Sequence, residues 1–344
     1  MKPPTRATLS AGLIAAGCLF AAAGAHAGAT IFNTAGGAAT STIALGMNND
    51  GSLNTSDGSV AVNSSRTGIA YKFPDGSYRD GIAPGAFSEG WGVSTSSGGG
   101  HSGFANVSTD GGPNNLNIGS FVSGLSTATS TVTLTSLPGL SVVHSAAPSA
   151  AAPGSLFEVK VTITNNTGAA IDNVKYVRVI DWDIPLTEFA EFVTIGGTAT
   201  TSLLEFSSDN GFASANPLGP DPVGILPGTT NVDFTDSGPA DLGAYFRFNF
   251  GTIDAGGTYE FLIFYGATGS ERTAFSAMEA AGIELYSLGQ SSPPSGSPTT
   301  GTPATFIFGF VGVGGTPQVV PIPGTLALVA IGLFGMGVAR RRFA

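Results

Sequence analysis

The stretch that decides the fold class lies near the middle of the chain and reads Phe157-Glu158-Val159-Lys160-Val161-Thr162-Ile163-Thr164. Apolar side chains occupy every second position, and polar side chains occupy the positions between them. Because successive side chains of a strand point to opposite faces, this period of two predicts a strand with one buried face. Residues 165–168, Asn-Asn-Thr-Gly, predict a turn, since asparagine and glycine tolerate positive φ. A returning, alternating strand is expected over residues 171–180.

A second hairpin is expected further along the chain. Residues 244–250 and 258–265 are rich in aromatic and alternating side chains, and residues 254–257 between them read Asp-Ala-Gly-Gly. Residues 131–135 and 304–310 are further strand candidates.

One helix is expected over residues 271–281. Phe275, Met278 and Ala281 fall on one side of it, and Gly282 follows as a stop. Many short strands with glycine- and proline-rich turns and a single helix predict an all-β protein with a β-sandwich body.

The expected body covers residues 28–315, which suffices for one large sandwich or for two smaller ones with a sub-boundary near residues 140–150. Residues 291–303 contain four prolines, and we interpret them as a surface loop because the strand expected after them needs a sheet to pair with. The segment from Pro153 to Pro185 resembles the immunoglobulin-like repeats of bacterial surface proteins. The matching features are the Pro153-Gly154 turn, the strand from Val159 to Asn165, Gly168, and the closing proline.

The first 27 residues predict a cleaved signal peptide. Lys2 and Arg6 precede an apolar run over residues 9–23, and Ala25 and Ala27 form a small-x-small cleavage site around His26. The mature chain is then expected to begin at Gly28, after passage through the Sec translocon and cleavage by signal peptidase.

The single cysteine, Cys18, lies inside this expected signal peptide. Its alternative role is that of a lipidated cysteine, but the apolar run continues past it and Ala15 stands where such signals usually carry leucine. If the segment is removed, the mature chain contains no cysteine and forms no disulfide.

The C-terminal segment, residues 316–344, has three parts: Val320-Pro321-Ile322-Pro323, an uncharged stretch over residues 324–339, and the cluster Arg340-Arg341-Arg342. A helix over residues 324–339 would span roughly 24 Å, slightly less than the ~30 Å hydrocarbon core of a bilayer. The two prolines keep the residues before the helix extended, and the arginines stop transfer on the cytoplasmic side. The alternative interpretation is a plain C-terminal anchor.

This tail closely resembles the PEP-CTERM sorting signal that exosortases recognise. The family pattern Val-Pro-Glu-Pro, followed by Gly-Thr-Leu-Ala-Leu, matches here except that Ile322 replaces the glutamate. The resemblance implies transient anchoring in the inner membrane, cleavage near Val320–Pro323 by an exosortase, and delivery to the cell surface or extracellular space. It also implies association with exopolysaccharide and biofilm matrix.

The charge of the chain excludes one class of partner. Five of the 13 Lys and Arg residues lie in the two terminal segments, so the body carries eight basic and 23 acidic residues, a net charge of −15. Such a body repels nucleic acid.

Two groups of residues are candidate ligand-binding sites. Asp181-Trp182-Asp183 places two carboxylates beside an aromatic ring, which could hold a cation or a sugar. Glu89 and Trp91 lie in a glycine-flanked segment that could present the ring to a ligand. For both groups we favour the alternative that the tryptophan packs in the core, and that Asp181 and Asp183 cap a turn before Pro185.

No catalytic constellation and no metal or cofactor site is recognised in the sequence. The body's histidines, His101 and His144, have no second His or Cys at ligand spacing, which argues against zinc. Residues 48–54 contain calcium-loop residue types without the required spacing, so Ca²⁺ remains only an open alternative. We therefore expect a non-enzymatic surface or matrix protein, with a carbohydrate-binding or carbohydrate-cleaving sandwich as the alternative.

Overall fold

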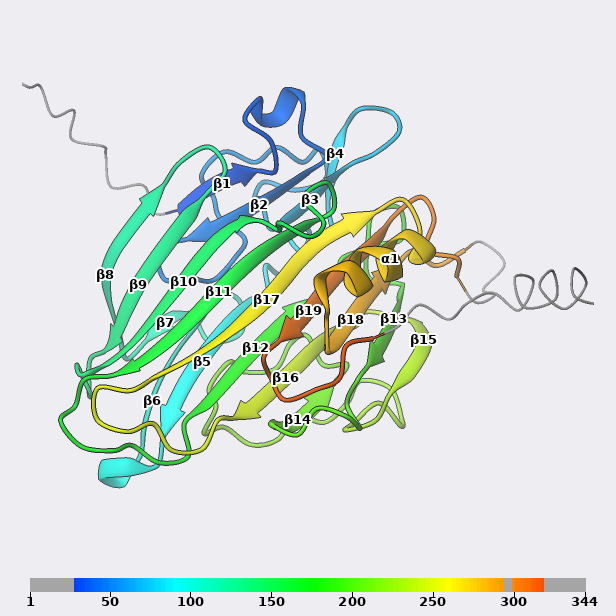
Figure 1. Cartoon of the computed structure of the whole chain (residues 1–344). Helices are drawn as coiled ribbons and strands as arrows, with labels where there is room; N and C mark the ends of the chain where they lie inside the picture. The colour runs from blue at the N-terminus through cyan, green and yellow to red at the C-terminus, as the bar shows by residue number, and fades with distance from the viewer. Residues whose placement is uncertain (1–27, 294–298, 319–344) are drawn as a thin grey trace, which may run out of the picture.

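The computed structural model describes residues 28–293 and 299–318. The predicted signal peptide, residues 294–298, and the predicted sorting motif with its apolar segment and arginines lie outside the described residues. The described part is all-β, with antiparallel sheets that pack as sandwich-like layers and one helix (Figure 1). This confirms the predicted fold class at that level.

The front layer in Figure 1 is a nine-stranded antiparallel sheet. In spatial order its strands are β15 (Phe234–Ala240), β13 (Glu191–Gly196), β18 (Leu285–Gln290), β19 (Thr305–Val311), β17 (Thr258–Thr268), β11 (Leu156–Asn165), β10 (Leu140–Pro148), β9 (Ala128–Leu134) and β8 (Leu116–Ser123).

The second layer is a six-stranded sheet that packs against the nine-stranded one. Its spatial order is β14 (Leu204–Ser208), β16 (Gly243–Asn249), β12 (Lys175–Asp181), β5 (Glu89–Thr95), β6 (His101–Asn106) and β7 (Gly112–Asn114).

A smaller four-stranded sheet lies beside one end of the sandwich, at the top of Figure 1. Its strands are β1 (Gly28–Phe32), β2 (Ile43–Asn48), β3 (Ile69–Lys72) and β4 (Tyr78–Asp80), and two short 3₁₀ turns, η1 (Gly37–Ala39) and η2 (Ser97–Gly99), complete the elements before the helix. Apolar residues of all three sheets form one continuous core cluster.

The fold-deciding stretch forms β11 with the expected alternation. Val159, Val161 and Ile163 are buried, while Lys160 between them is exposed. The strand pairs with β10 on one side and β17 on the other over its length, so its apolar face joins the core between the two large sheets. The sub-boundary suggested near residues 140–150 falls within β10.

The expected hairpins were wrong, although their strands are present. β11 and β12 lie in different sheets, as do β16 and β17, because the intervening turns cross from one layer to the other. β11 pairs instead with β17, and β12 pairs with β16. Asn165 holds the two crossing segments together, since its Nδ2 donates to the carbonyls of Ala169 and Ile253 at 2.7 and 2.8 Å.

The predicted helix is confirmed as α1 (Glu271–Ala281). Ser270 caps its first turn through the backbone N–H of Thr273, and Gly282 ends it with φ 67°. Ala274, Ala277 and Met278 pack on the outer face of the nine-stranded sheet, against residues such as Phe264 and Ile307. The central strands of that sheet are therefore buried on both faces. Among the described residues, no helix is long and apolar enough to cross a membrane.

Candidate cation-binding site

The two candidate groups from the sequence lie close together in the fold but make separate contacts. Glu89 and Trp91 are on β5, and Asp181 ends the neighbouring strand β12, with Glu89 paired to Ile180 in the register. The side chains of Trp91 and Trp182 are both 0% exposed. Neither ring reaches the surface. Both lie in the core, as our favoured interpretation of the sequence expected.

Trp182 joins the two large sheets. Its Nε1 donates a 3.0 Å hydrogen bond to Ser287 Oγ on β18, and its ring lies against Phe306 of β19 with the centroids 6.5 Å apart. A Cβ added to Gly289 would lie 2.7 Å from Trp182 Cδ2, so the glycine allows the ring to rest directly on the opposite strand. Trp182 is therefore a core residue that couples the end of β12 to the nine-stranded sheet.

Glu89 belongs to a buried ion pair rather than to a ligand platform. Its Oε1 accepts from Arg178 Nε at 2.5 Å, and its Oε2 accepts from the backbone N–H of Leu53 at 2.6 Å. Arg178 also donates to the carbonyl of Gly51. The pair thus ties the loop after β2 to the six-stranded sheet.

Trp91 packs within the same network. Its Nε1 donates to the carbonyl of Asp50 at 2.8 Å, and its ring stacks on Tyr176 and meets His144 edge-on. Residues 48–54, whose composition suggested a calcium loop, are used here for backbone contacts with Trp91, Arg178 and Glu89.

Burial shifts the pKa values of the ionisable groups in this network. Burial lowers the pKa of His144 well below its ordinary value, with the charge of Arg178 adding to the effect, so the ring is neutral. Burial opposes the charge of Arg178, yet attraction by Glu89 outweighs it and keeps the pKa of the guanidinium above its usual range. Burial raises the pKa of Tyr176 to about 12. These groups stay in fixed protonation states near neutral pH.

The interpretation of Asp181 and Asp183 as exposed turn caps was wrong. Asp181 is 1% exposed and Asp183 is 0% exposed. Backbone hydrogen bonds hold both residues in the interior: Asp181 N–H donates to the carbonyl of Ser88, and Asp183 N–H donates to the carbonyl of Gly81. The chain turns inward here because Ile184 and Trp182 on either side of Asp183 are themselves core residues.

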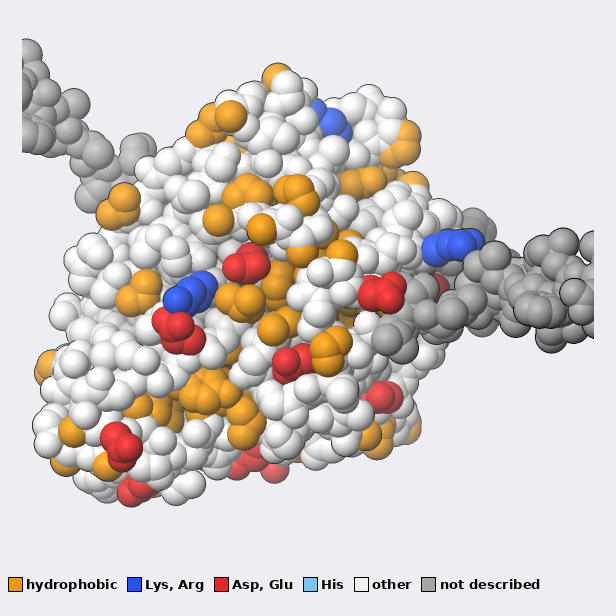
Figure 2. All heavy atoms as spheres, in the orientation of Figure 1, with side chains coloured by type: hydrophobic (Ala, Val, Ile, Leu, Met, Phe, Trp, Pro, Cys, Tyr) orange, Lys and Arg blue, Asp and Glu red, His pale blue; other side chains and the backbone are white. Residues whose placement is uncertain are grey.

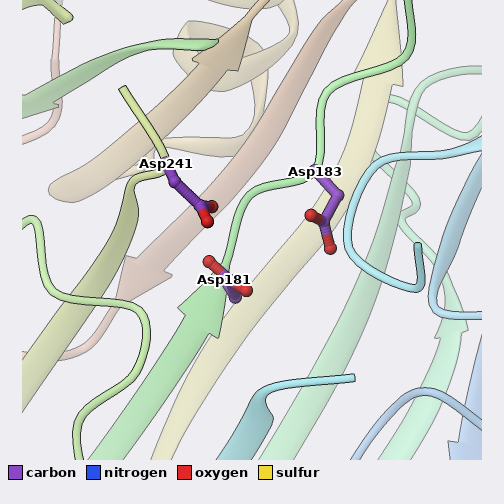
Figure 3. Close-up of side chains that lie close together, drawn as sticks. All are labelled: Asp181, Asp183 and Asp241. Atoms are coloured by element: carbon purple, nitrogen blue, oxygen red, sulfur yellow. The ribbon is translucent and has the colours of Figure 1, made fainter. Parts of the chain in front are cut away.

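A third aspartate, Asp241, completes a group with Asp181 and Asp183 (Figure 3). One carboxylate oxygen from each of the three residues lies within 4.8 Å of the others. Figure 3 shows the carboxyl groups of Asp181 and Asp241 turned toward one another, with that of Asp183 beside them. Asp241 comes from the short connection between β15 and β16 and is half-buried, so the group reaches solvent on that side.

A fourth carboxylate, Glu191, begins β13 and is fully buried. Its Oε1 accepts from the backbone N–H of Leu242 at 2.7 Å. The sequence analysis did not single out Asp241 or Glu191. Asp241 lies 60 residues and Glu191 lies 10 residues after Asp181 in the sequence, and neither stands in a recognisable motif. Only the packing of the two sheets brings them near Asp181.

Burial raises the pKa of all four carboxyl groups, and the charges of neighbouring carboxylates add to the effect for Asp181, Asp183 and Glu191. Burial first, and then the charges of Asp241, Asp80 and Glu188, raise the pKa of Asp183 to about 8. Burial raises the pKa of Glu191 to about 9, although the N–H of Leu242 opposes the shift.

The other two carboxyl groups shift in the same direction. Burial, with Asp183, Asp241 and Glu191 adding to it, raises the pKa of Asp181 well above its ordinary value, and burial also raises that of Asp241. In the described part of the chain, no lysine or arginine is among the charges that act on these four groups.

Chemically, this arrangement offers only oxygen atoms. Carboxylates without imidazole or thiol suit hard cations such as Ca²⁺ and Mg²⁺ rather than zinc or copper. The sequence-predicted pair Asp181 and Asp183 is therefore part of a larger acidic group, while Glu89 is not. In comparisons with known proteins, no family model matches the chain and no curated protein matches it significantly.

Proposed function

We propose that this chain is an exported structural protein of the cell surface or extracellular matrix, delivered through an exosortase-type sorting tail. The proposed signal peptide, 1–27, and the PEP-CTERM-like tail, 316–344, direct the route. The body contributes a rigid β-sandwich to an exopolysaccharide-containing envelope. The partners are then the Sec translocon, signal peptidase, an exosortase and extracellular polysaccharide.

The observation that carries the structural role is the complete burial of both tryptophans. Protein surfaces that hold sugars commonly present an aromatic ring on which the sugar stacks, beside polar groups that fix its orientation. Trp91 and Trp182 are 0% exposed and bonded through Nε1 to Asp50 and Ser287, so neither provides such a platform. This supports a scaffold over the alternative of a carbohydrate-binding or carbohydrate-cleaving sandwich.

The surface charge supports the same proposal. On the face drawn in Figure 2, lysine and arginine side chains stand singly among uncharged and acidic ones and form no basic patch. A body of net charge −15 is suited to solubility outside the cell and is repelled by nucleic acid and by anionic lipid.

The sorting part of the proposal is tested by two substitutions in the tail of the native protein. We expect Pro323→Ala to impair release from the membrane more than Ile322→Ala, since the second proline matches the sorting pattern and Ile322 already departs from it. Cell fractionation followed by immunoblotting measures the released fraction. Equal release of both variants and of the unsubstituted chain would contradict recognition of the motif.

The structural part is tested with a panel of polysaccharides. We expect the released protein to bind none of them through a site that depends on Trp91 or Trp182. A folded Trp182→Phe or Trp91→Phe variant that has lost an affinity present in the unsubstituted protein would favour the carbohydrate-binding alternative.

A further inference from the structure

We propose that Asp181, Asp183 and Asp241, with the carboxylate of Glu191 beside them, bind a calcium ion that joins the two large sheets of the sandwich. The proposal rests on the placement and hydrogen bonding of these four residues and is independent of how the protein is exported.

The first argument is the number of buried oxygens that lack a partner. Five carboxylate oxygens in this group accept no hydrogen bond: Asp181 Oδ1, Asp183 Oδ1, Asp183 Oδ2, Glu191 Oε2 and Asp241 Oδ1. Asp183 is the clearest case, because its side chain is 0% exposed and both of its oxygens lack a partner. A buried polar group without a partner is costly, and a cation satisfies several such oxygens at once.

A nearby carboxylate shows what a satisfied buried group looks like in this protein. Asp80 is also 0% exposed, but its oxygens accept from the backbone N–H groups of Gly68, Ile82 and Ala83 at 2.7 to 3.0 Å. The backbone thus supplies donors to Asp80. It supplies none to Asp183, which leaves that carboxylate available to a cation.

The second argument is where the four residues come from. Asp181 ends β12 in the six-stranded sheet, and Glu191 begins β13 in the nine-stranded sheet. Asp241 lies where the chain passes from β15 of one sheet to β16 of the other. Its neighbour Leu242 donates its N–H to Glu191 and accepts at its carbonyl from Trp182 N–H, so the crossing segment is fixed to both layers. A cation at this point would hold the two sheets together.

The chemistry of the group favours calcium. Ca²⁺ takes six to eight oxygen ligands at flexible geometry, from monodentate or bidentate carboxylates and from water. The three aspartates supply four of the unpartnered oxygens, and one oxygen of each lies within 4.8 Å of the others. Water entering on the half-exposed side of Asp241 can supply further ligands. A divalent ion would also offset the repulsion that raises the pKa of Asp181 and Asp183.

The test uses the purified protein, freed of metal with a chelator and then returned to calcium. We expect one tightly held Ca²⁺ per chain by isothermal titration calorimetry. At pH 8 we expect a rise in Tm of about 5–10 °C in calcium at about 100 times the dissociation constant. Sodium chloride at matched ionic strength should give no comparable rise. At pH 5 the calcium effect should shrink, because protons compete for Asp181, Asp183, Asp241 and Glu191, with Asp80 and Glu188 nearby.

Two variants keep the proposal falsifiable. Asp183→Asn should raise the Tm of the metal-free protein, since it removes one buried repelling carboxylate, and should abolish most of the response to calcium. Asp75→Asn is the matched control: Asp75 is an exposed turn aspartate that bonds Ser77 and Arg79, so the calcium response should be unchanged.

Three outcomes would overturn the proposal. One is a Tm at pH 8 that is the same with chelator and with calcium. Another is a rise that sodium chloride reproduces. The third is a calcium response that survives in Asp183→Asn.

Discussion

Replacing Trp182 with alanine tests how strongly the two sheets depend on this ring. Trp182 is 0% exposed, packs on Gly289 and Phe306, and donates to Ser287 Oγ. Truncating a buried tryptophan costs about 3–5 kcal/mol, and leaving Ser287 without its donor adds about 1 kcal/mol. For a body of this size the combined loss of about 4–6 kcal/mol should lower Tm by roughly 8–24 °C, at about 2–4 °C per kcal/mol. Val223→Ala, at a residue that is 82% exposed, is the control and should change stability by less than about 0.5 kcal/mol.

A double-mutant cycle with Gly289→Ala shows whether the contact itself carries this effect. The added Cβ would lie 2.7 Å from Trp182 Cδ2 and 2.5 Å from Ile184 Cδ1, so it should cost about 1–3 kcal/mol in the unsubstituted protein. In the Trp182→Ala background the ring is gone, and the cost should fall by about 1 kcal/mol. Urea unfolding followed by circular dichroism measures all four proteins. Strict additivity, or a Trp182→Ala protein as stable as the control, would refute the placement of this ring between the sheets.

The buried charges and the cap of the helix can each be tested by measuring stability. In chelator, the free energy of unfolding should fall as pH rises from about 6.5 to about 8, because native Asp183 and Glu191 keep protons that the unfolded chain releases. Below about pH 6.5 the neutral, buried His144 acts in the opposite direction, because the unfolded chain protonates this ring. Urea titrations at pH 7 and 8 should show about 1 kcal/mol lost per pH unit for each carboxyl group, and stability that rises between these two pH values would contradict the assignment. Glu89→Gln should destabilise by about 3 kcal/mol, since it leaves Arg178 charged and buried. Glu260→Gln, which breaks an exposed pair with Lys160, should leave the unfolding midpoint nearly unchanged in the same assay. Ser270→Ala should cost about 1 kcal/mol by removing the cap of α1, and an unchanged unfolding midpoint would show that the cap contributes nothing.

Local patterns in the sequence were sufficient to predict the helix and six of the strands, namely β9, β11, β12, β16, β17 and β19. The alternation around Val161 reflects one buried face, and Gly282 ends α1 because an αL residue is needed there. The pairing of strands could not be predicted in the same way. Alternation tells which face is buried but not which sheet a strand joins, so β11 and β12 were expected to form a hairpin although they belong to different sheets.

The composition of the acidic group could be predicted only in part from the sequence. Asp181 and Asp183 stood out because they flank a tryptophan, whereas Asp241 and Glu191 carry no local signal. Their proximity arises only where β12, β13, β15 and β16 end at one point between the layers. Burial of Asp181 and Asp183 was also unpredictable, since a proline at 185 is as compatible with an exposed turn as with an inward one.

The termini of the mature protein decide whether the proposed tail is processed and the protein is delivered to the cell surface. Mass spectrometry of protein taken from the surface of the native cell should find a start at Gly28 and no peptide containing Arg340–Arg342. Recovery of the tri-arginine peptide from surface protein would contradict the claim.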